Sequence, residues 1–224
     1  MKNRYCVGTH LSERKFLRLL ECFCLDITAS KAALLCRLNK NTSHRFYALF
    51  RARVIAIAIG ENAPFGGEIE VDESYFGPRR VRGKRGRGAS GKIPVVGLLK
   101  RQGRVYVKPV ESCSRKDLLP IIKGQILEQA TIYTDGWKAY DCLVTEGYRH
   151  HRIHHHENEF SRGRNHVNGI ESFWSYAKLR MAQMKGIRKD RFLDHLLESQ
   201  WRWNHRQENT LLILKESLLN SPLI

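Results

Sequence analysis

The 224-residue sequence carries 39 lysines and arginines against 22 acidic residues, a formal net charge of +17 that favours a polyanionic partner, above all nucleic acid. No stretch approaches the roughly 18 consecutive apolar residues of a membrane-spanning helix, and the start MKNRYCVGTH lacks the apolar core of a secretion signal. We therefore expect a cytoplasmic protein with no membrane partner, whose six cysteines are buried thiols rather than disulfides.

The first sixty residues are expected to form three helices. Ser12, Thr28 and Thr42 each stand where a helix can begin, and apolar residues recur at helical spacing after them. The third segment is basic and contains Arg45 and Arg51. This order fits a helix-turn-helix unit that contacts DNA through these arginines, because the second helix of such a motif enters a groove. An ordinary three-helix bundle with a solvated basic face fits equally well.

The pattern changes to alternation at residue 68. Ile69 and Val71 face one way, while Glu70 and Asp72 face the other, which predicts a strand. A capping-box pattern at Ser114, with an acid three residues later, predicts the start of a helix. We expect further strands over 94–100, 104–110, 131–134 and 148–153, and further helices over 114–126, 137–146, 168–184, 190–206 and 210–219.

Three carboxylates stand at the edges of these elements. Asp72 lies in the first strand, Asp135 directly after the strand over 131–134, and Glu171 in the first turn of a late helix. Mg²⁺ prefers oxygen ligands and keeps some of its waters, so a few carboxylates and a substrate phosphate complete its shell. Two such ions can activate the attacking oxygen and stabilise the leaving oxygen of a phosphodiester. This placement favours a shared metal site.

Each of these acids also has a structural explanation. Asp135 precedes a glycine and is a common type of turn residue. Glu171 follows Asn168 by three residues, which is the spacing of a capping box. Asp72 has rivals in Glu70 and Glu73, although Glu73 is expected on the apolar face of the strand. From the residues alone, both explanations remain open.

Three segments carry a resemblance to a known family. EIEVDESYFGPRRVRGKRGRGASGKIPVVGLL, IYTDGWKAY and HVNGIESFWSYAKLRM resemble the signature blocks of short bacterial insertion-sequence transposases of the DDE class. The resemblance covers residues 65–206. It rests on three motifs in the right order, with 62 residues between Asp72 and Asp135 and 35 between Asp135 and Glu171.

The resemblance implies an α/β fold, a ribonuclease-H-like mixed sheet flanked by helices. It implies that Asp72 bridges two Mg²⁺ ions, for which Mn²⁺ can substitute, while Asp135 and Glu171 each bind one. It also implies DNA strand cleavage and strand transfer on terminal inverted repeats and target DNA. We expect a helical DNA-binding region over 1–62, a catalytic domain over 63–224 and a homo-oligomer on DNA.

One departure concerns the start of the chain. Members of this group often begin with a cysteine-rich zinc ribbon, and no such spacing is present. End recognition is then expected to rest on the helical region and on basic surfaces. An alternative is an inactive relative that survives as a DNA-binding regulator. A cellular ribonuclease H or resolvase shares the metal chemistry but lacks the first two blocks.

A basic, glycine-rich loop is expected between the first two strands. Glycine keeps its backbone flexible and arginine offers bidentate hydrogen bonds to phosphate, so we favour a DNA contact over a solvated charge run. Its cationic residues are Arg79, Arg80, Arg82, Lys84, Arg85, Arg87 and Lys92.

Histidines and aromatic residues carry weaker signals. Five histidines over 150–156 favour a polar, DNA-facing segment over a metal site. His166 lies five residues before Glu171, either as a catalytic contact to the scissile phosphate or to a metal-bound water, or as a helix-entry residue. The aromatic residues of the later helices fit a core better than base stacking, namely Phe173, Trp174, Trp201 and Trp203.

Overall fold

The computed structural model describes residues 3–77, 91–135, 138–153, 168–184 and 186–224. The chain divides into two compact units. One unit contains Met1–Glu61 and Met181–Ile224, and the other contains Asn62–Arg180. No helix among the described residues is long and apolar enough to cross a bilayer.

The first unit is entirely helical. The three expected N-terminal helices are confirmed, although the third begins earlier than Thr42, because the side chain of Asn39 accepts a hydrogen bond from the backbone N–H of Asn41 at 2.8 Å and caps the helix there. Its elements are α1 (Glu13–Cys24), α2 (Ala29–Cys36), α3 (Lys40–Gly60), η3 (Lys189–Arg191), α6 (Phe192–Asn204) and α7 (Thr210–Asn220).

Helices from both ends of the chain share the core of this unit. Phe16 of α1 and Phe50 of α3 are fully buried and pack edge to face at 5.4 Å. Trp201 of α6 and Leu214 and Leu218 of α7 belong to the same buried cluster. The apolar faces expected for the last two helices are therefore covered by the N-terminal helices.

The second unit is built on a five-stranded mixed sheet, with strand order β3-β2-β1-β4-β5. β1 is antiparallel to β2 and parallel to β4, β2 is antiparallel to β3, and β4 is parallel to β5. The expected α/β class, a mixed sheet flanked by helices, is confirmed. The strands are β1 (Glu68–Phe76), β2 (Ile93–Lys100), β3 (Val105–Pro109), β4 (Thr131–Asp135) and β5 (Arg149–Ile153).

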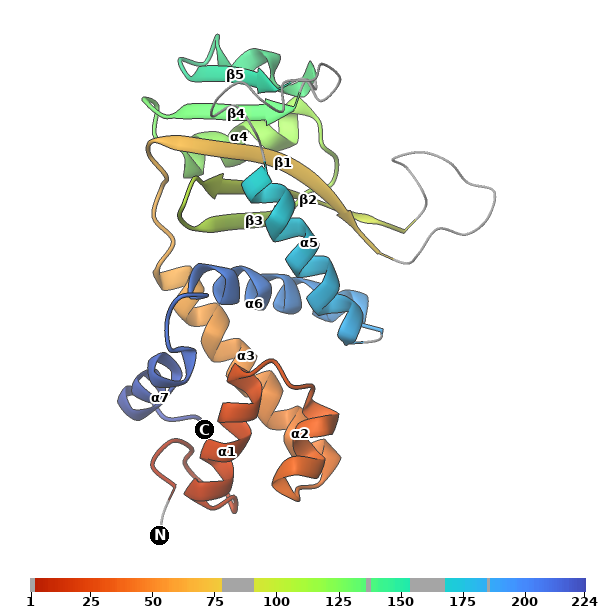
Figure 1. The fold of residues 1–224 in the computed structure, drawn as a ribbon, viewed down its shortest axis with the longest axis vertical. Helices are drawn as coiled ribbons and strands as arrows, with labels where there is room; N and C mark the ends of the chain where they lie inside the picture. Colours follow the sequence, from red (N-terminus) through yellow and green to blue (C-terminus); the bar gives the residue numbers. More distant parts are fainter. Residues whose placement is uncertain (1–2, 78–90, 136–137, 154–167, 185) are drawn as a thin grey trace. The chain divides into compact units, whose positions relative to one another are not determined.

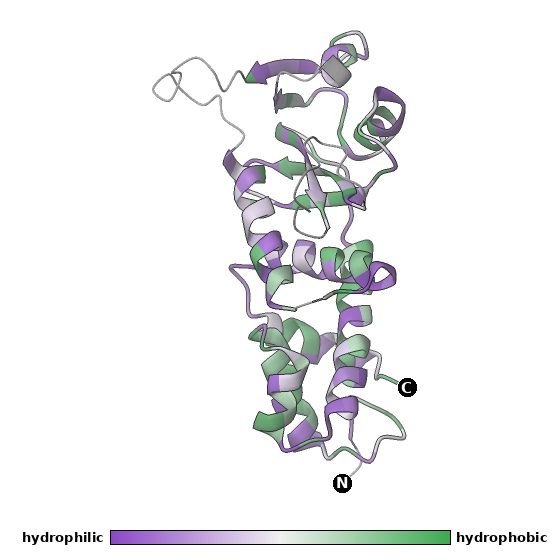
Figure 2. Cartoon of the chain, turned by 90° about the vertical axis from the view of Figure 1, so that its right-hand side faces the viewer, coloured by the Kyte–Doolittle hydropathy of each residue, from purple (hydrophilic) through white to green (hydrophobic). Residues whose placement is uncertain are grey.

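The two faces of the sheet carry different helices. Ile69 and Val71 point to a buried cluster that includes Leu118 and Ile122 of α4 (Arg115–Gln125). The alternate residues of β1 point to the opposite face, which α5 (Asn168–Gln183) crosses. β5 reads RHHRI at the edge of the sheet and is hydrophilic except for its last residue (Figure 2).

Two local predictions need correction. The segment over 137–146 is described only as the short 3₁₀ helix η1 (Lys138–Leu143). The capping box at Ser114 does not form, because the Asp117 carboxylate accepts hydrogen bonds from the Ser114 hydroxyl and from the backbone N–H of Ser112. Asp117 therefore accepts hydrogen bonds from the Ser114 hydroxyl and the Ser112 backbone instead of forming a capping box with Ser114.

The expectation of buried thiols is confirmed for five cysteines and is wrong for Cys24, which is partly exposed. All six are free thiols, and five are buried. Cys22 and Cys36 lie in the core of the helical unit with their sulfur atoms 4.0 Å apart.

Candidate active site

Pairing between β1 and β4 brings the two aspartates together. Val71 pairs with Thr134 in the parallel register, and Asp72 and Asp135 each follow that pair directly. Paired residues of parallel strands point to the same side of a sheet, so the next residue on each strand also shares a side. Asp72 and Asp135 therefore occupy equivalent positions on neighbouring strands, although 62 residues separate them in sequence.

The third carboxylate comes from α5, on the same face of the sheet. Glu171 is exposed and lies in the first turn of this helix. Trp174, three residues later, donates its indole N–H to the Asp72 carboxylate at 3.0 Å. Asn168 is the first residue of α5, so Glu171 is the fourth residue and stands one position beyond that of a capping box.

The charges of the three acids interact. The pKa of Asp72 is raised to about 6, chiefly by burial, and the negative charges of Asp135 and Glu171 add to this effect. Hydrogen bonds from the backbone of Glu73 and from Trp174 oppose it. The site therefore brings negative charges close to a partly buried carboxylate, whose own ionised form is disfavoured there.

Trp174 was expected to be a core residue, and its 4% exposure confirms this. Its hydrogen bond to Asp72 was not expected, because a pattern of buried residues does not reveal where a polar group points. The indole lies directly on Gly97 of β2, where an added Cβ would come within 2.5 Å of the ring. Glycine at this position therefore allows the indole to reach Asp72.

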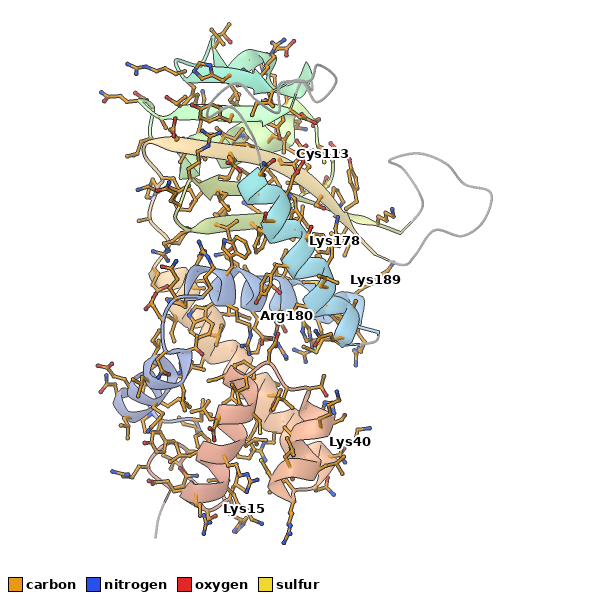
Figure 3. All side chains as sticks on the ribbon, viewed as in Figure 1. Lys15, Lys40, Cys113, Lys178, Arg180 and Lys189 are labelled. Carbon is orange, nitrogen blue, oxygen red and sulfur yellow. The ribbon has the colours of Figure 1, made fainter. Side chains whose placement is uncertain are left out.

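Lysines contribute positive charge to this face. Lys178 lies seven residues after Glu171, on the same side of α5, with its ammonium 5.7 Å from the centre of the Phe76 ring (Figure 3). Burial lowers its pKa, the negative charge of Asp72 raises it and the positive charge of Lys92 lowers it. The helical spacing is a sequence signal that could have identified Lys178.

The donor set is suited to a hard cation. Asp72, Asp135 and Glu171 offer only carboxylate oxygens, the ligand type that Mg²⁺ prefers, and a bound dication would offset their mutual repulsion. In the described part of the chain, no group of three or more His, Cys, Asp or Glu side chains is drawn together closely enough to hold a metal ion.

The arginines of α3 differ in their surroundings. Arg45 is exposed. Arg51 instead donates from Nε to the buried Glu198 carboxylate at 2.6 Å. Of these two expected DNA contacts, only Arg45 presents its side chain openly to solvent.

Several predicted contacts fall outside the described residues. Lys92, directly before β2, is the one member of the basic loop that is described, and it is partly buried. The others outside the description are Arg79, Arg80, Arg82, Lys84, Arg85, Arg87, His154, His155, His156 and His166.

The described histidines of the cluster lie on β5 and bind protein groups. His150 shares a hydrogen bond of 2.8 Å with the Thr134 hydroxyl, and His151 stacks on the Tyr133 ring. Their contacts lie on opposite faces of the sheet, as expected for consecutive residues of a strand.

Comparisons with known proteins find a matching family model and two similar proteins. Residues 64–204 match the model of the "ISXO2-like transposase domain". The chain is 31% identical over 121 residues to an "Uncharacterized transposase-like protein" of Haemophilus influenzae, covering 54% of this chain and 98% of that protein. It is 32% identical over 152 residues to an "Uncharacterized protein in transposable element ISH50" of Halobacterium salinarum, covering 61% of this chain and 52% of that protein.

A solved structure is also similar. The "Crystal structure of the Mos1 Strand Transfer Complex" shares 10% sequence identity with this chain, with a TM-score of 0.33, over 95% of this chain and 79% of that one.

Proposed function

Because this chain belongs to the ISXO2-like transposase domain family, we propose that it cuts and rejoins double-stranded DNA at insertion-sequence ends. The substrates are terminal inverted repeats and target DNA. In the first step, water attacks the phosphorus of an end phosphodiester and the 3′ oxygen leaves. In the second step, the freed 3′-hydroxyl attacks a target phosphodiester and displaces its 3′ oxygen. No covalent intermediate with the enzyme is needed.

Three acids would hold the metal ions for this reaction, namely Asp72, Asp135 and Glu171. Two Mg²⁺ ions, or Mn²⁺ in their place, activate the attacking oxygen and stabilise the leaving oxygen when bound. The observation that carries the proposal is geometric: the β1–β4 register places Asp72 and Asp135 at equivalent positions of neighbouring strands, and α5, which carries Glu171, contacts Asp72 through Trp174. Asp72 is oriented by the Trp174 indole.

Cationic groups near the acids would bind the DNA backbone. Lys178 and Lys92 lie close enough to Asp72 or to each other for their charges to interact, so both can contact the phosphate that reacts. We also propose that His166 contacts the scissile phosphate. Arg45 of α3, which is exposed, would also contact DNA, and the chain would act on DNA as a homo-oligomer.

The basic loop gives a prediction about binding. Deleting residues 79–88 removes six cations, so DNA binding is expected to weaken and to depend less on salt. Each lost phosphate contact reduces the slope of log affinity against log salt by about 0.9 on duplex DNA. Fluorescence anisotropy over a series of salt concentrations measures the slope, and an unchanged slope excludes a phosphate contact by this loop.

Strand cleavage tests the proposed reaction. The protein is expected to nick DNA that carries the terminal repeat when Mg²⁺ or Mn²⁺ is present, and to bind the same DNA without cutting it when EDTA is added. Asp135→Asn, prepared in the same way, is the control for contaminating nucleases. Binding without cleavage under any metal condition would favour the alternative, an inactive DNA-binding regulator.

A further inference from the structure

Glu70 is a buried carboxylate on the same face of β1 as Asp72. Its residue exposure is 1%, and a buried charge is costly unless it is paired and hydrogen-bonded. One oxygen accepts a hydrogen bond from Nε of Arg101 at 3.2 Å. The other accepts a hydrogen bond from the backbone N–H of Ile170 at 2.9 Å. The carboxylate therefore joins a strand and a helix.

The Ile170 N–H belongs to the first turn of α5. The first four N–H groups of an α-helix have no partner within the helix, and a nearby negative charge also interacts favourably with the helix dipole. Such groups are commonly capped by a side chain just before the helix. Here the acceptor comes from β1, 100 residues away in sequence.

The contact needs a close approach of the helix to the strand. A Cβ added at Gly169 would lie 2.9 Å from Glu70 Oε2 and 3.0 Å from Leu99 Cδ2. Glycine at this position therefore allows the first turn of α5 to contact the Glu70 carboxylate. Glu171 directly follows the residue that Glu70 binds.

Arg101 holds the other side of Glu70. Its guanidinium lies 3.8 Å from the centre of the Tyr133 ring on β4, and its side chain is 13% exposed. The charge of Glu70 is thereby paired within the sheet. The two acids on this face of β1 therefore differ in role. Glu70 is paired with a cation within the fold, whereas Asp72, two residues later, belongs to the proposed metal site.

We propose that Glu70 is a positioning residue, which anchors the first turn of α5 to β1 and so sets where Glu171 stands relative to Asp72. The inference rests on the proposed function in that Glu171 is taken as a metal ligand. The contact between Glu70 and α5 does not depend on metal binding, and it can be measured separately.

Hydrogen exchange measures the anchor. In Glu70→Ala, the amides of residues 168–174 are expected to exchange about tenfold faster or more, the size expected for losing a hydrogen bond to a charged group. Glu70→Gln keeps an oxygen for the Ile170 N–H while losing the ion pair with Arg101, so it is expected to restore most of the protection. If Glu70 only stabilised the fold as a whole, exchange over residues 168–174 would be similar in the two variants.

Gly169→Ala provides a second route that leaves the Glu70–Arg101 pair in place. Alanine has the higher helix propensity, which by itself would slow exchange in this turn. Its Cβ would collide with the Glu70 carboxylate, so we expect faster exchange instead. Glu68→Ala is the matched control, because Glu68 is on the same strand and its partners include Arg101 and Tyr133. Its effect on residues 168–174 is expected to be small.

Calorimetric titration with Mn²⁺ links the anchor to the site. Glu70→Ala is expected to bind Mn²⁺ about tenfold more weakly or worse, the usual cost of losing a group that orients a metal ligand.

Unchanged exchange over 168–174 in Glu70→Ala and Gly169→Ala would overturn the inference. So would normal Mn²⁺ binding in Glu70→Ala when Glu171→Gln binds weakly. If Glu171→Gln binds Mn²⁺ like the parent, the metal role of Glu171 fails, and exchange still decides whether Glu70 anchors α5.

Discussion

Glu171→Gln is expected to lower strand cleavage by roughly a thousandfold, because the loss of several kcal/mol of charge stabilisation corresponds to about three powers of ten in rate. A neutral amide oxygen is a poor ligand for a hard dication. The side chain is exposed, so the free energy of unfolding is expected to change by less than about 0.5 kcal/mol. Cleavage rates on terminal-repeat DNA and thermal melting measure the two effects.

The matched control is Glu216→Gln, which makes the same substitution at an exposed position of α7. Both the cleavage rate and the melting temperature of this variant should stay close to those of the parent. If Glu171→Gln also cleaves at the parent rate, Glu171 is not a metal ligand and the third ligand must be sought elsewhere.

Glu198→Ala is expected to destabilise the helical unit by about 3–5 kcal/mol, the usual cost of removing one partner from a buried ion pair. Glu198 is 1% exposed and accepts hydrogen bonds from Nε of Arg51 at 2.6 Å and from Nε of Arg202 at 2.9 Å. Arg202 also donates to the backbone carbonyls of Phe23 and Cys24. Without the carboxylate, two guanidinium groups lose a shared counter-charge.

Urea unfolding of Glu198→Ala and Glu13→Ala measures this effect. Glu13 forms an ion pair with Arg4, whose side chain is 69% exposed, so its loss should cost far less than the loss of Glu198. Equal destabilisation by the two substitutions would show that the network around Glu198 contributes no more than a surface pair does.

Much of the secondary structure could be predicted because periodicity is a local property. Alternation from residue 68 located β1, and helical spacing located α5 within a residue of its start. The same reasoning gave a wrong prediction after Asp135, because a short run with helical composition does not distinguish an α-helix from the short 3₁₀ helix η1. Capping at Ser114 failed because several nearby donors compete for one carboxylate.

The chain's sequence by itself determined its basic charge and most of the order of its strands and helices, and the resemblance of three of its motifs to a known family selected three candidate metal ligands from 22 acids. Only the tertiary structure decided which partners the remaining charged and polar groups take. In the folded chain Glu70 binds Arg101 and the first turn of α5. The Trp174 indole donates a hydrogen bond to Asp72, and Arg51 donates one to Glu198. The reason is physical: hydrogen-bond and ion-pair partners are set by distances between segments 31 to 147 residues apart in sequence, and local patterns carry no record of those distances.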